Sequence, residues 1–222
     1  MPQADAVLAV CAHPDDETFG LGALLAGFAD RGAAVSLLCF TRGEASTLGL
    51  GGRDLGELRV EELRAATREL GVGRVELGDH PDGRLGEVPL ELLAGEVASM
   101  ISEVHPDLLL VFDEGGISGH PDHRRATEVA VAAADSANVP VLAWTLPEEV
   151  AATLNAELGT SFIGRGGPEL DLVVEVDRAR QRKAISAHRS QSSDNPVLWR
   201  RLELQGSLEV LRWLRPPSTT AR

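Results

Sequence analysis

Two short stretches of the chain carry most of its candidate catalytic side chains. The first is Ala-His-Pro-Asp-Asp-Glu at residues 12–17, and the second is Gly-His-Pro-Asp-His-Arg at residues 119–124. A catalytic Zn²⁺ takes imidazole nitrogens and carboxylate oxygens as three protein ligands and keeps one position open for water. Two histidines and one aspartate from these stretches supply such a set. A remaining carboxylate can then accept a proton from water, and a remaining imidazole can stabilise an oxyanion or protonate an amine.

The His-Pro-Asp triplet by itself also has an ordinary structural meaning, because Asp caps helices and Pro begins them. The chain contains the same triplet twice more, at residues 80–82 and 105–107. The doubled acid at Asp15 and Asp16 and the second histidine at His123 distinguish the two candidate stretches from these turns. The pattern therefore favours a metal site over two unrelated turns.

Apolar runs alternate with segments of helical spacing along the whole chain. This order predicts right-handed βαβ units, a mostly parallel sheet of Rossmann-like α/β type, and helices on both faces. The chain shows no linker, so we expect one domain over residues 1–222, with a frayed tail at 216–222. Strands are expected at 6–11, 34–41, 74–78, 108–112, 141–144 and 172–176, and helices at 22–31, 57–70, 90–104, 124–137, 178–187 and 197–214.

The expected sheet sorts the histidines by position. Ligands of open α/β sheets bind outside the carboxyl ends of the strands. The histidines that follow a strand belong to this edge, whereas His105 precedes a strand and belongs to the opposite edge. His188 follows a helix, so the rule does not place it. We therefore expect four histidines at the edge where ligands bind: His13, His80, His120 and His123.

The composition excludes several classes of partner. The chain has 21 basic and 34 acidic residues and a formal net charge of −13, which repels nucleic acid and anionic membrane surfaces. No apolar run approaches the ~18 residues of a membrane span, and the first residues carry no basic region typical of a secretory signal. We therefore expect a cytoplasmic protein with a small-molecule substrate. Cys11 and Cys39 lie in apolar runs and are expected to be buried free thiols.

Two other motif interpretations fail. Residues 20–25 lack the third glycine of a dinucleotide-binding fingerprint and begin too far beyond the first strand. Residues 116–119 miss the Gly-x-Ser-x-Gly motif of serine hydrolases by one position.

Four segments together resemble the PIG-L/LmbE-like deacetylase family. Residues 12–17 and 120–123 resemble its two signature motifs in order and spacing, and residues 41–44 resemble the segment after its second strand. Residues 187–191 resemble its C-terminal His-x-Ser-Gln motif. The similarity runs from about residue 6 to about residue 191. It implies a Rossmann-like fold and a zinc-dependent hydrolysis of N-acetyl groups, usually on N-acetylglucosaminyl substrates.

The resemblance implies a role for each matching residue. The zinc ligands would be His13, Asp16 and His123. Asp15 would be the general base, and His120 the oxyanion stabiliser and general acid. Asp122 would be the carboxylate that orients His120, and Glu17, which opens the first helix, suits a structural role.

Substrate contacts are less well marked in the sequence. Some relatives place a tyrosine before the second motif, but this chain contains no tyrosine, so zinc and His120, with weak help from Ser118, would polarise the carbonyl. A Gly-rich segment at 49–56 is expected to cover the site. Each candidate contact also has a plain structural alternative, such as a solvated helix arginine or an Asp-Gly turn. The candidate substrate-binding residues are Arg59, Glu44, Asp82 and His188.

The sequence thus predicts a zinc-dependent hydrolase that releases acetate from an N-acetylglucosamine-type amino-sugar derivative. Two alternatives remain at this point: an amidase on a larger sugar conjugate such as a thiol-sugar adduct, and a non-catalytic carbohydrate-binding relative. Fe²⁺ also suits a site of two histidines and one carboxylate. A homo-oligomer is compatible with the sequence.

Overall fold

The computed structural model describes residues 1–48 and 54–218 of the chain. Its strands are β1 (Ala6–Cys11), β2 (Ala34–Thr41), β3 (Arg74–His80), β4 (Leu108–Phe112), β5 (Val141–Pro147), β6 (Gly164–Arg165), β7 (Leu172–Glu175) and β8 (Leu208–Arg215). Its helices are α1 (Asp16–Phe19), α2 (Gly22–Asp30), α3 (Leu55–Leu70), α4 (Leu90–Val104), α5 (Gly116–Gly119), α6 (Pro121–Ala137), α7 (Glu148–Leu158), α8 (Ala179–Ala187), α9 (Arg189–Ser192) and α10 (Pro196–Gln205), with 3₁₀ turns η1 (Leu85–Glu87) and η2 (Gly167–Glu169).

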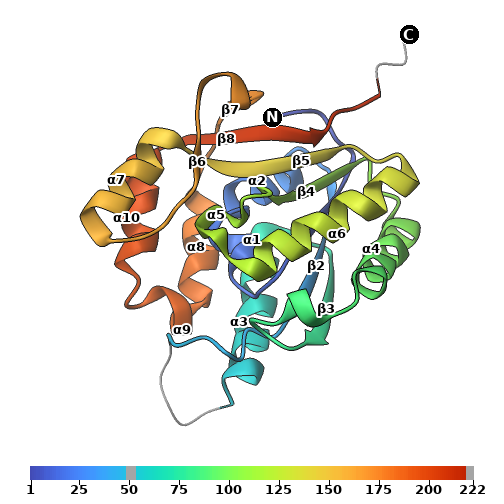
Figure 1. Ribbon diagram of the computed structural model, residues 1–222, viewed down its shortest axis with the longest axis horizontal. Helices are drawn as coiled ribbons and strands as arrows, with labels where there is room; N and C mark the ends of the chain where they lie inside the picture. The colour runs from blue at the N-terminus through green and yellow to red at the C-terminus, as the bar shows by residue number, and fades with distance from the viewer. Residues whose placement is uncertain (49–53, 219–222) are drawn as a thin grey trace.

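The strands form a mostly parallel sheet in the order β3-β2-β1-β4-β5-β8-β7, with β6 beside β5 (Figure 1). Strands β1 to β5 are parallel to one another, and β8 joins antiparallel to both β5 and β7. The strand order reverses direction between β1 and β4, and ligands of such sheets bind at this switch point. The predicted parallel α/β fold is confirmed.

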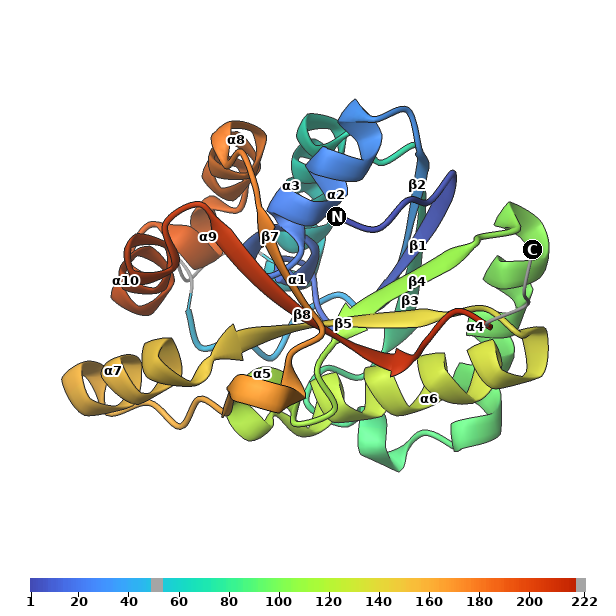
Figure 2. The ribbon, with the colours of Figure 1, turned by 90° about the horizontal axis from the view of Figure 1, so that it is seen from above.

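Helices cover both faces of the sheet, as predicted (Figure 2). Alternate residues of β1 face opposite ways, and Val7, Ala9 and Cys11 pack in a core with α2, α3 and α8. Leu8 and Val10 pack on the other face with α4 and α6. Burial on both faces explains why the central strands are apolar without interruption. Both Cys11 and Cys39 are buried free thiols, which confirms that prediction.

The predicted helix at 197–214 is wrong in its second half. Helix α10 ends at Gln205, its C-cap residue Gly206 adopts a positive φ of 56°, and β8 then runs antiparallel to β5. The segment Leu-Glu-Val-Leu-Arg-Trp-Leu has apolar residues at spacings that suit a helix as well as a half-buried strand. Pairing with β5 decides the outcome, because burying Val210 and Leu211 against the sheet requires an extended chain.

The predicted cover at 49–56 lies partly outside the described residues, because 49–53 are not described. The remaining residues, 54–56, form the beginning of α3. Asp54 caps the helix by accepting a hydrogen bond from the Glu57 backbone amide at 3.3 Å, and residues 55–56 belong to its first turn. Among the described residues, no helix combines the length and the apolar character needed to cross a membrane.

Candidate functional site

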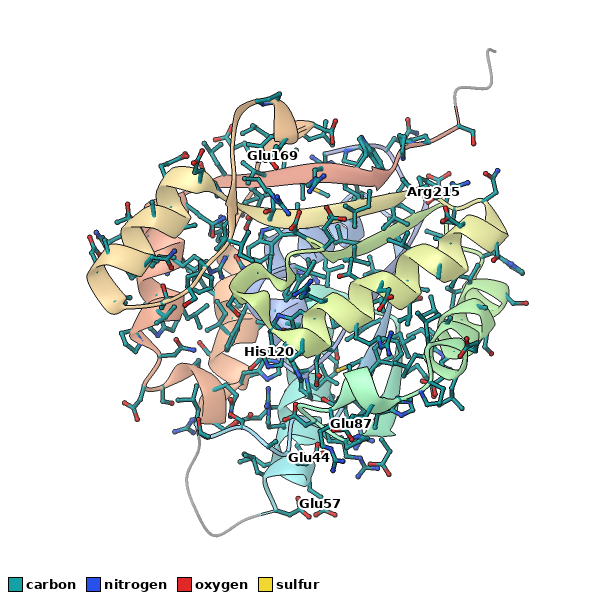
Figure 3. The ribbon with its side chains drawn as sticks, viewed as in Figure 1. Glu44, Glu57, Glu87, His120, Glu169 and Arg215 are labelled. Carbon is teal, nitrogen blue, oxygen red and sulfur yellow. The ribbon has the colours of Figure 1, made fainter. Side chains whose placement is uncertain are left out.

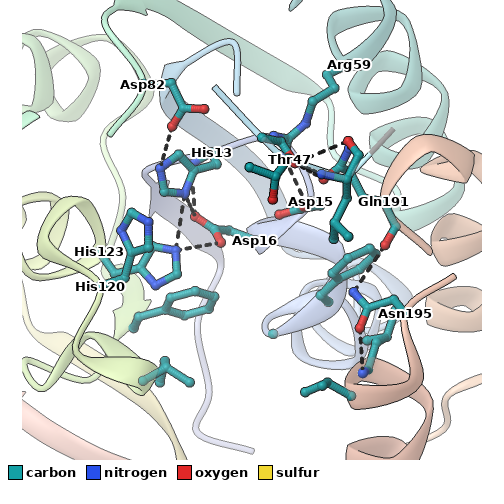
Figure 4. A pocket seen from close by; sticks show the side chains of 18 of the residues that line it. His13, Asp15, Asp16, Thr47, Arg59, Asp82, His120, His123, Gln191 and Asn195 are labelled. Carbon is teal, nitrogen blue, oxygen red and sulfur yellow. Dashed lines mark hydrogen bonds and ion pairs between the residues drawn. The ribbon is translucent and has the colours of Figure 1, made fainter. Parts of the chain in front are cut away.

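The two motif stretches meet at the switch point of the sheet. Strand β1 leads directly into residues 12–17, and the adjacent parallel strand β4 leads into the turn and α5 that precede His120. Their carboxyl ends therefore open on the same edge. A cavity of about 490 Å³ lies there, lined by His13, Asp15, Asp16, His120 and His123 among others (Figure 4).

Three donor atoms converge at one end of this cavity. His13 Nδ1 lies 3.2 Å from His123 Nε2, which lies 3.1 Å from Asp16 Oδ1. The second oxygen of Asp16 is 3.7 Å from His13 Nδ1. Ligands bound to zinc at 2.0–2.2 Å in a tetrahedron are about 3.3 Å apart. The separations of 3.2 and 3.1 Å at His123 Nε2 match this value, whereas the 3.7 Å contact involves the other carboxylate oxygen of Asp16. The donor set therefore fits a divalent metal ion.

Hydrogen bonds outside the triad aim each donor inward. His123 Nδ1 donates to the Gly116 carbonyl at 3.2 Å, so its Nε2 lone pair faces the other two donors. Asp16 Oδ2 accepts from the backbone amides of Ala12 and His13 at 3.1 and 2.9 Å, which leaves Oδ1 toward His123. Histidine ligands of metals characteristically donate their other ring nitrogen to a carboxylate or carbonyl in this way.

His13 has potential metal-binding partners on both sides of its ring, through Nδ1 and through Nε2. Its Nε2 lies 3.0 Å from Asp82 Oδ1 and 3.3 Å from Asp122 Oδ2, which makes a second cluster of donors on the far side of the ring. Burial alone lowers the pKa of His13, but hydrogen bonds to Asp122 and Asp82 outweigh it and raise the pKa to about 10. A metal ligand must be the neutral ring, and for that form we assign the N–H to Nε2 and the metal-facing lone pair to Nδ1, because the carboxylates accept from Nε2.

Asp15 occupies a strained position beside the triad. Its backbone has a φ of 105°, a value rare for residues other than glycine, and its amide donates to Glu17 Oε2 at 2.8 Å. Arg59 Nη2 donates to Asp15 Oδ2 at 2.9 Å. Burial raises the pKa of Asp15 to about 6, against the lowering effect of Arg59 and with a further rise from Asp16. A carboxylate held this way can accept a proton near neutral pH.

His120 presents a donor to the cavity. It precedes α6, and its Nδ1 accepts a hydrogen bond from the Asp122 backbone amide at 3.2 Å. Burial, reinforced by His123 and His13, lowers the pKa of His120, so the neutral ring is favoured. With Nδ1 as acceptor, the proton of the neutral ring lies on Nε2, which can donate to a developing oxyanion.

The predicted orientation of His120 by Asp122 is wrong. The fully buried Asp122 carboxylate accepts from His13 Nε2 and from the backbone amides of Gly83 and Leu85, at 2.8 and 3.1 Å. Pro121 begins α6 at this point, and the first helical turn directs the Asp122 side chain toward His13 while His120 caps the helix. Asp122 therefore positions His13.

Asp122→Asn is expected to weaken metal binding by roughly 10–100-fold, because the amide would present an N–H donor or a weaker acceptor to His13 Nε2. Competition with a fluorescent zinc chelator measures the affinity. As a matched control, Asp107→Asn removes a carboxylate that caps the opposite end of β1 through the backbone amides of Asp5 and Ala6. Wild-type zinc affinity in Asp122→Asn would contradict the assignment.

The four predicted substrate contacts have different outcomes. Asp82 and Arg59 line the cavity, but Arg59 is buried and its guanidinium is already bonded to the Gly43 and Pro14 carbonyls and to Asp15. Glu44 lies on the surface after β2, apart from His120 in Figure 3, and accepts from the Asp82 amide at 2.9 Å. Arg59 and Glu44 thus position Asp15 and Asp82, and the cavity lining does not include Glu44.

His188 as a substrate contact is wrong. It is fully buried and outside the cavity lining, and its Nε2 donates to Glu17 Oε1 at 2.7 Å. The other Glu17 oxygen accepts from the strained amide of Asp15. His188 and Glu17 therefore form a buried pair under the first motif, and the structural role expected for Glu17 is supported. His80 ends β3 and so lies at this edge of the sheet, as expected, but it contacts Glu96 at 2.8 Å and does not line the cavity.

The side of the cavity opposite His13 was not predicted from the sequence, although Gln191 belongs to the motif at residues 187–191. This side includes Gln191 of α9, Asn195 of the turn after α9, and Arg201 of α10. Figure 4 labels Gln191 and Asn195, which lie across the cavity from His13. Phe112 also lines the cavity and could have been predicted from the sequence, because it is the last residue of a buried strand whose carboxyl end faces the site. The large apolar side chains of the cavity lining are Phe19, Leu48, Phe112, Ile117, Trp144, Phe162, Val197 and Leu198.

Comparison with known proteins agrees with this geometry. Residues 8–134 match the PIG-L family, described as GlcNAc-PI de-N-acetylase. The chain is 38% identical to a 1D-myo-inositol 2-acetamido-2-deoxy-alpha-D-glucopyranoside deacetylase of Streptomyces griseus over 65% of this chain and 53% of that protein. It is 32% identical to the protein of the same name from Salinispora arenicola over 87% of this chain and 78% of that one.

A solved structure of a deacetylase in the biosynthesis pathway of teicoplanin superimposes with a TM-score of 0.70 and 25% identity, covering 96% of this chain and 100% of that one. The chain spans about half the length of several curated relatives that it matches. The family match covers more than half of the chain and includes both motif stretches. The chain therefore belongs to the PIG-L family.

Proposed function

We propose that this protein is a zinc-dependent deacetylase that hydrolyses the N-acetyl group of an N-acetylglucosamine-type amino sugar. One observation carries the proposal: a three-donor metal site, the carboxylate of Asp15 and the ring of His120 line one end of a single cavity. Hydrolysis of an amide needs an activated water, a base and a hydrogen-bond donor for the oxyanion. The metal site would activate the water, Asp15 would be the base, and His120 would be the donor.

His13, Asp16 and His123 would hold the metal through the atoms described above. Zinc, when bound, would supply a Lewis acid that polarises the carbonyl and makes water more acidic. Fe²⁺ is compatible with the same donors, and the affinity of this set for each ion is open to measurement.

The remaining steps belong to the chain's own side chains. Asp15 accepts a proton from water as the oxygen attacks the acetyl carbon, while Arg59 keeps the carboxylate in place. His120 Nε2–H donates to the oxyanion that develops on the carbonyl oxygen. When the C–N bond breaks, Asp15 returns its proton to the departing nitrogen, so that acetic acid and a free amine are the products.

The substrate class is supported by the relatives, whose names describe deacetylases of an N-acetylglucosaminyl inositol. The cavity has room for a sugar and a second group beyond it, since a pocket of about 490 Å³ lies within the usual range for small-molecule sites. Retention of Asp15 and His120 beside the donor triad argues against a non-catalytic carbohydrate-binding relative.

The proposal is tested by assaying zinc-loaded protein on three substrates: the N-acetylglucosaminyl inositol, methyl N-acetylglucosaminide, and an amide conjugate of a thiol to glucosamine. We expect acetate and free amine in equal amounts from at least one N-acetylglucosaminide. Amine release from the thiol conjugate alone would favour the amidase alternative. If metal binds and none of the substrates is hydrolysed, the proposed function is wrong.

A further inference from the structure

Part of the cavity lining leads from the metal ligand His123 along two aromatic rings to a buried cation. The Phe112 ring centroid lies 5.0 Å from that of His123 and 5.2 Å from that of Trp144. The Cζ atom of Arg201 lies 5.2 Å from the centroid of the Trp144 ring. All four residues line the cavity. A ligand held at His123 can thus extend over an apolar surface toward one guanidinium group.

Arg201 is buried without a charged partner among the described residues. Its side chain is only 4% exposed, and its Nη1 and Nη2 donate to Gln205 Oε1 at 2.6 Å and to the Phe19 carbonyl at 2.5 Å. Both acceptors are neutral. A guanidinium has five N–H donors, so two such bonds leave it with donors to spare. A buried charge without a counter-ion is costly, which makes this site receptive to an anion.

The nearby carboxylate of Glu209 is already engaged. It accepts from Arg178 Nη1 at 2.5 Å, from Trp144 Nε1 at 2.6 Å and from Gln205 Nε2 at 3.1 Å. One carboxylate therefore stands beside two guanidinium groups, and the cluster carries an excess positive charge. Burial lowers the pKa of Arg201 to about 10, Glu209 opposes this shift, and Arg178 adds to it. This local excess of positive charge contrasts with the formal net charge of −13 of the whole chain.

We propose that the cavity accepts an N-acetylglucosaminide whose second group is apolar next to the sugar and ends in an oxyanion, a carboxylate or a phosphate, that pairs with Arg201. The inference rests on the proposed deacetylase function and specifies its substrate. The apolar part would pack against Phe112 and Trp144. The oxyanion would accept charge-assisted hydrogen bonds from the guanidinium, whose planar fork of N–H donors matches carboxylate and phosphate oxygens.

The test compares three N-acetylglucosaminides that differ at one position: the phenyl, the 4-carboxyphenyl and the 4-phosphonophenyl glycosides. For the wild-type protein we expect kcat/KM for at least one anionic glycoside to exceed that for the phenyl glycoside by about 10-fold or more, as for a hydrogen bond to a charged group. The carboxylate and phosphonate arms identify which oxyanion is preferred. In Arg201→Met the ratio of anionic to neutral kcat/KM is expected to fall to about 1 or below.

Arg200→Met is the matched control. Arg200 is the adjacent residue of α10, it is paired on the surface with Glu157 and Glu203, and it does not line the cavity. This variant should keep the wild-type ratio. If wild-type protein hydrolyses all three glycosides at similar kcat/KM, the inference is wrong and Arg201 only supports the fold. That result needs no variant, so a misfolded Arg201→Met would not obscure it. If none of the three is hydrolysed but another N-acetylglucosaminide is, the proposed function stands and this inference fails.

Discussion

Asp15→Asn is expected to lower kcat by about 10²–10⁴-fold, the usual contribution of general acid–base catalysis, while the bound metal stays near one ion per chain. The amide is close in size to the carboxylate but cannot accept a proton from water. It can still face Arg59 through its oxygen, so the strained backbone at this position should persist. Acetate release under saturating substrate measures kcat, and elemental analysis measures the metal.

Asp79→Asn is the control for this substitution. Asp79 is an exposed carboxylate at the same end of the sheet, paired with Arg42 and outside the cavity lining. It should retain wild-type kcat. A turnover within about threefold of wild type in Asp15→Asn would leave Asp15 with no part in proton transfer and would require another base.

His123→Ala is expected to lose both metal and activity. It removes one of three donors and leaves His13 Nδ1 and Asp16 Oδ1 without the atom that both approach. The loss of affinity should exceed the 10–100-fold that is typical when only a supporting hydrogen bond is removed. Metal content after dialysis against a weak chelator, followed by acetate release, measures both effects.

His105→Asn serves as the comparison, because His105 is exposed at the end of α4, on the side of the sheet from which β4 starts. Its φ of 46° lies in the left-handed region, which asparagine tolerates well. This variant should bind metal and turn over substrate as wild type does. Stoichiometric metal in His123→Ala would mean that the ion is held elsewhere, for example by the second donor cluster around His13 Nε2.

Local pattern and topology together were enough to predict where the central residues of the site lie. Continuous apolar strands followed by helices imply a parallel sheet, and the carboxyl ends of parallel strands share an edge. His13 and His123 are separated by 110 positions, yet each follows one of two adjacent central strands, so their meeting could be predicted. The β8 strand could not, because its apolar spacing fits two periods and only pairing with β5 distinguishes them.

The errors in the site have a common physical cause, since each depends on the direction of a side chain. The partner of Asp122 is decided by the first turn of α6, which sends the carboxylate to His13 while the helix is capped by His120. The contact of His188 with Glu17 spans 171 positions and arises only when α8 packs beside α1. Arg201 resembles any solvated arginine of an amphipathic helix, and only tertiary packing shows it to be buried.

The central claim is that one metal ion binds between His13, Asp16 and His123 in a cavity built for amide hydrolysis. Anomalous diffraction at the zinc edge from crystals of the zinc-loaded protein tests it most directly. The account predicts a single strong peak within about 2.2 Å of His13 Nδ1, Asp16 Oδ1 and His123 Nε2. A peak between His13 Nε2, Asp82 and Asp122, or no peak within reach of His13, would contradict it.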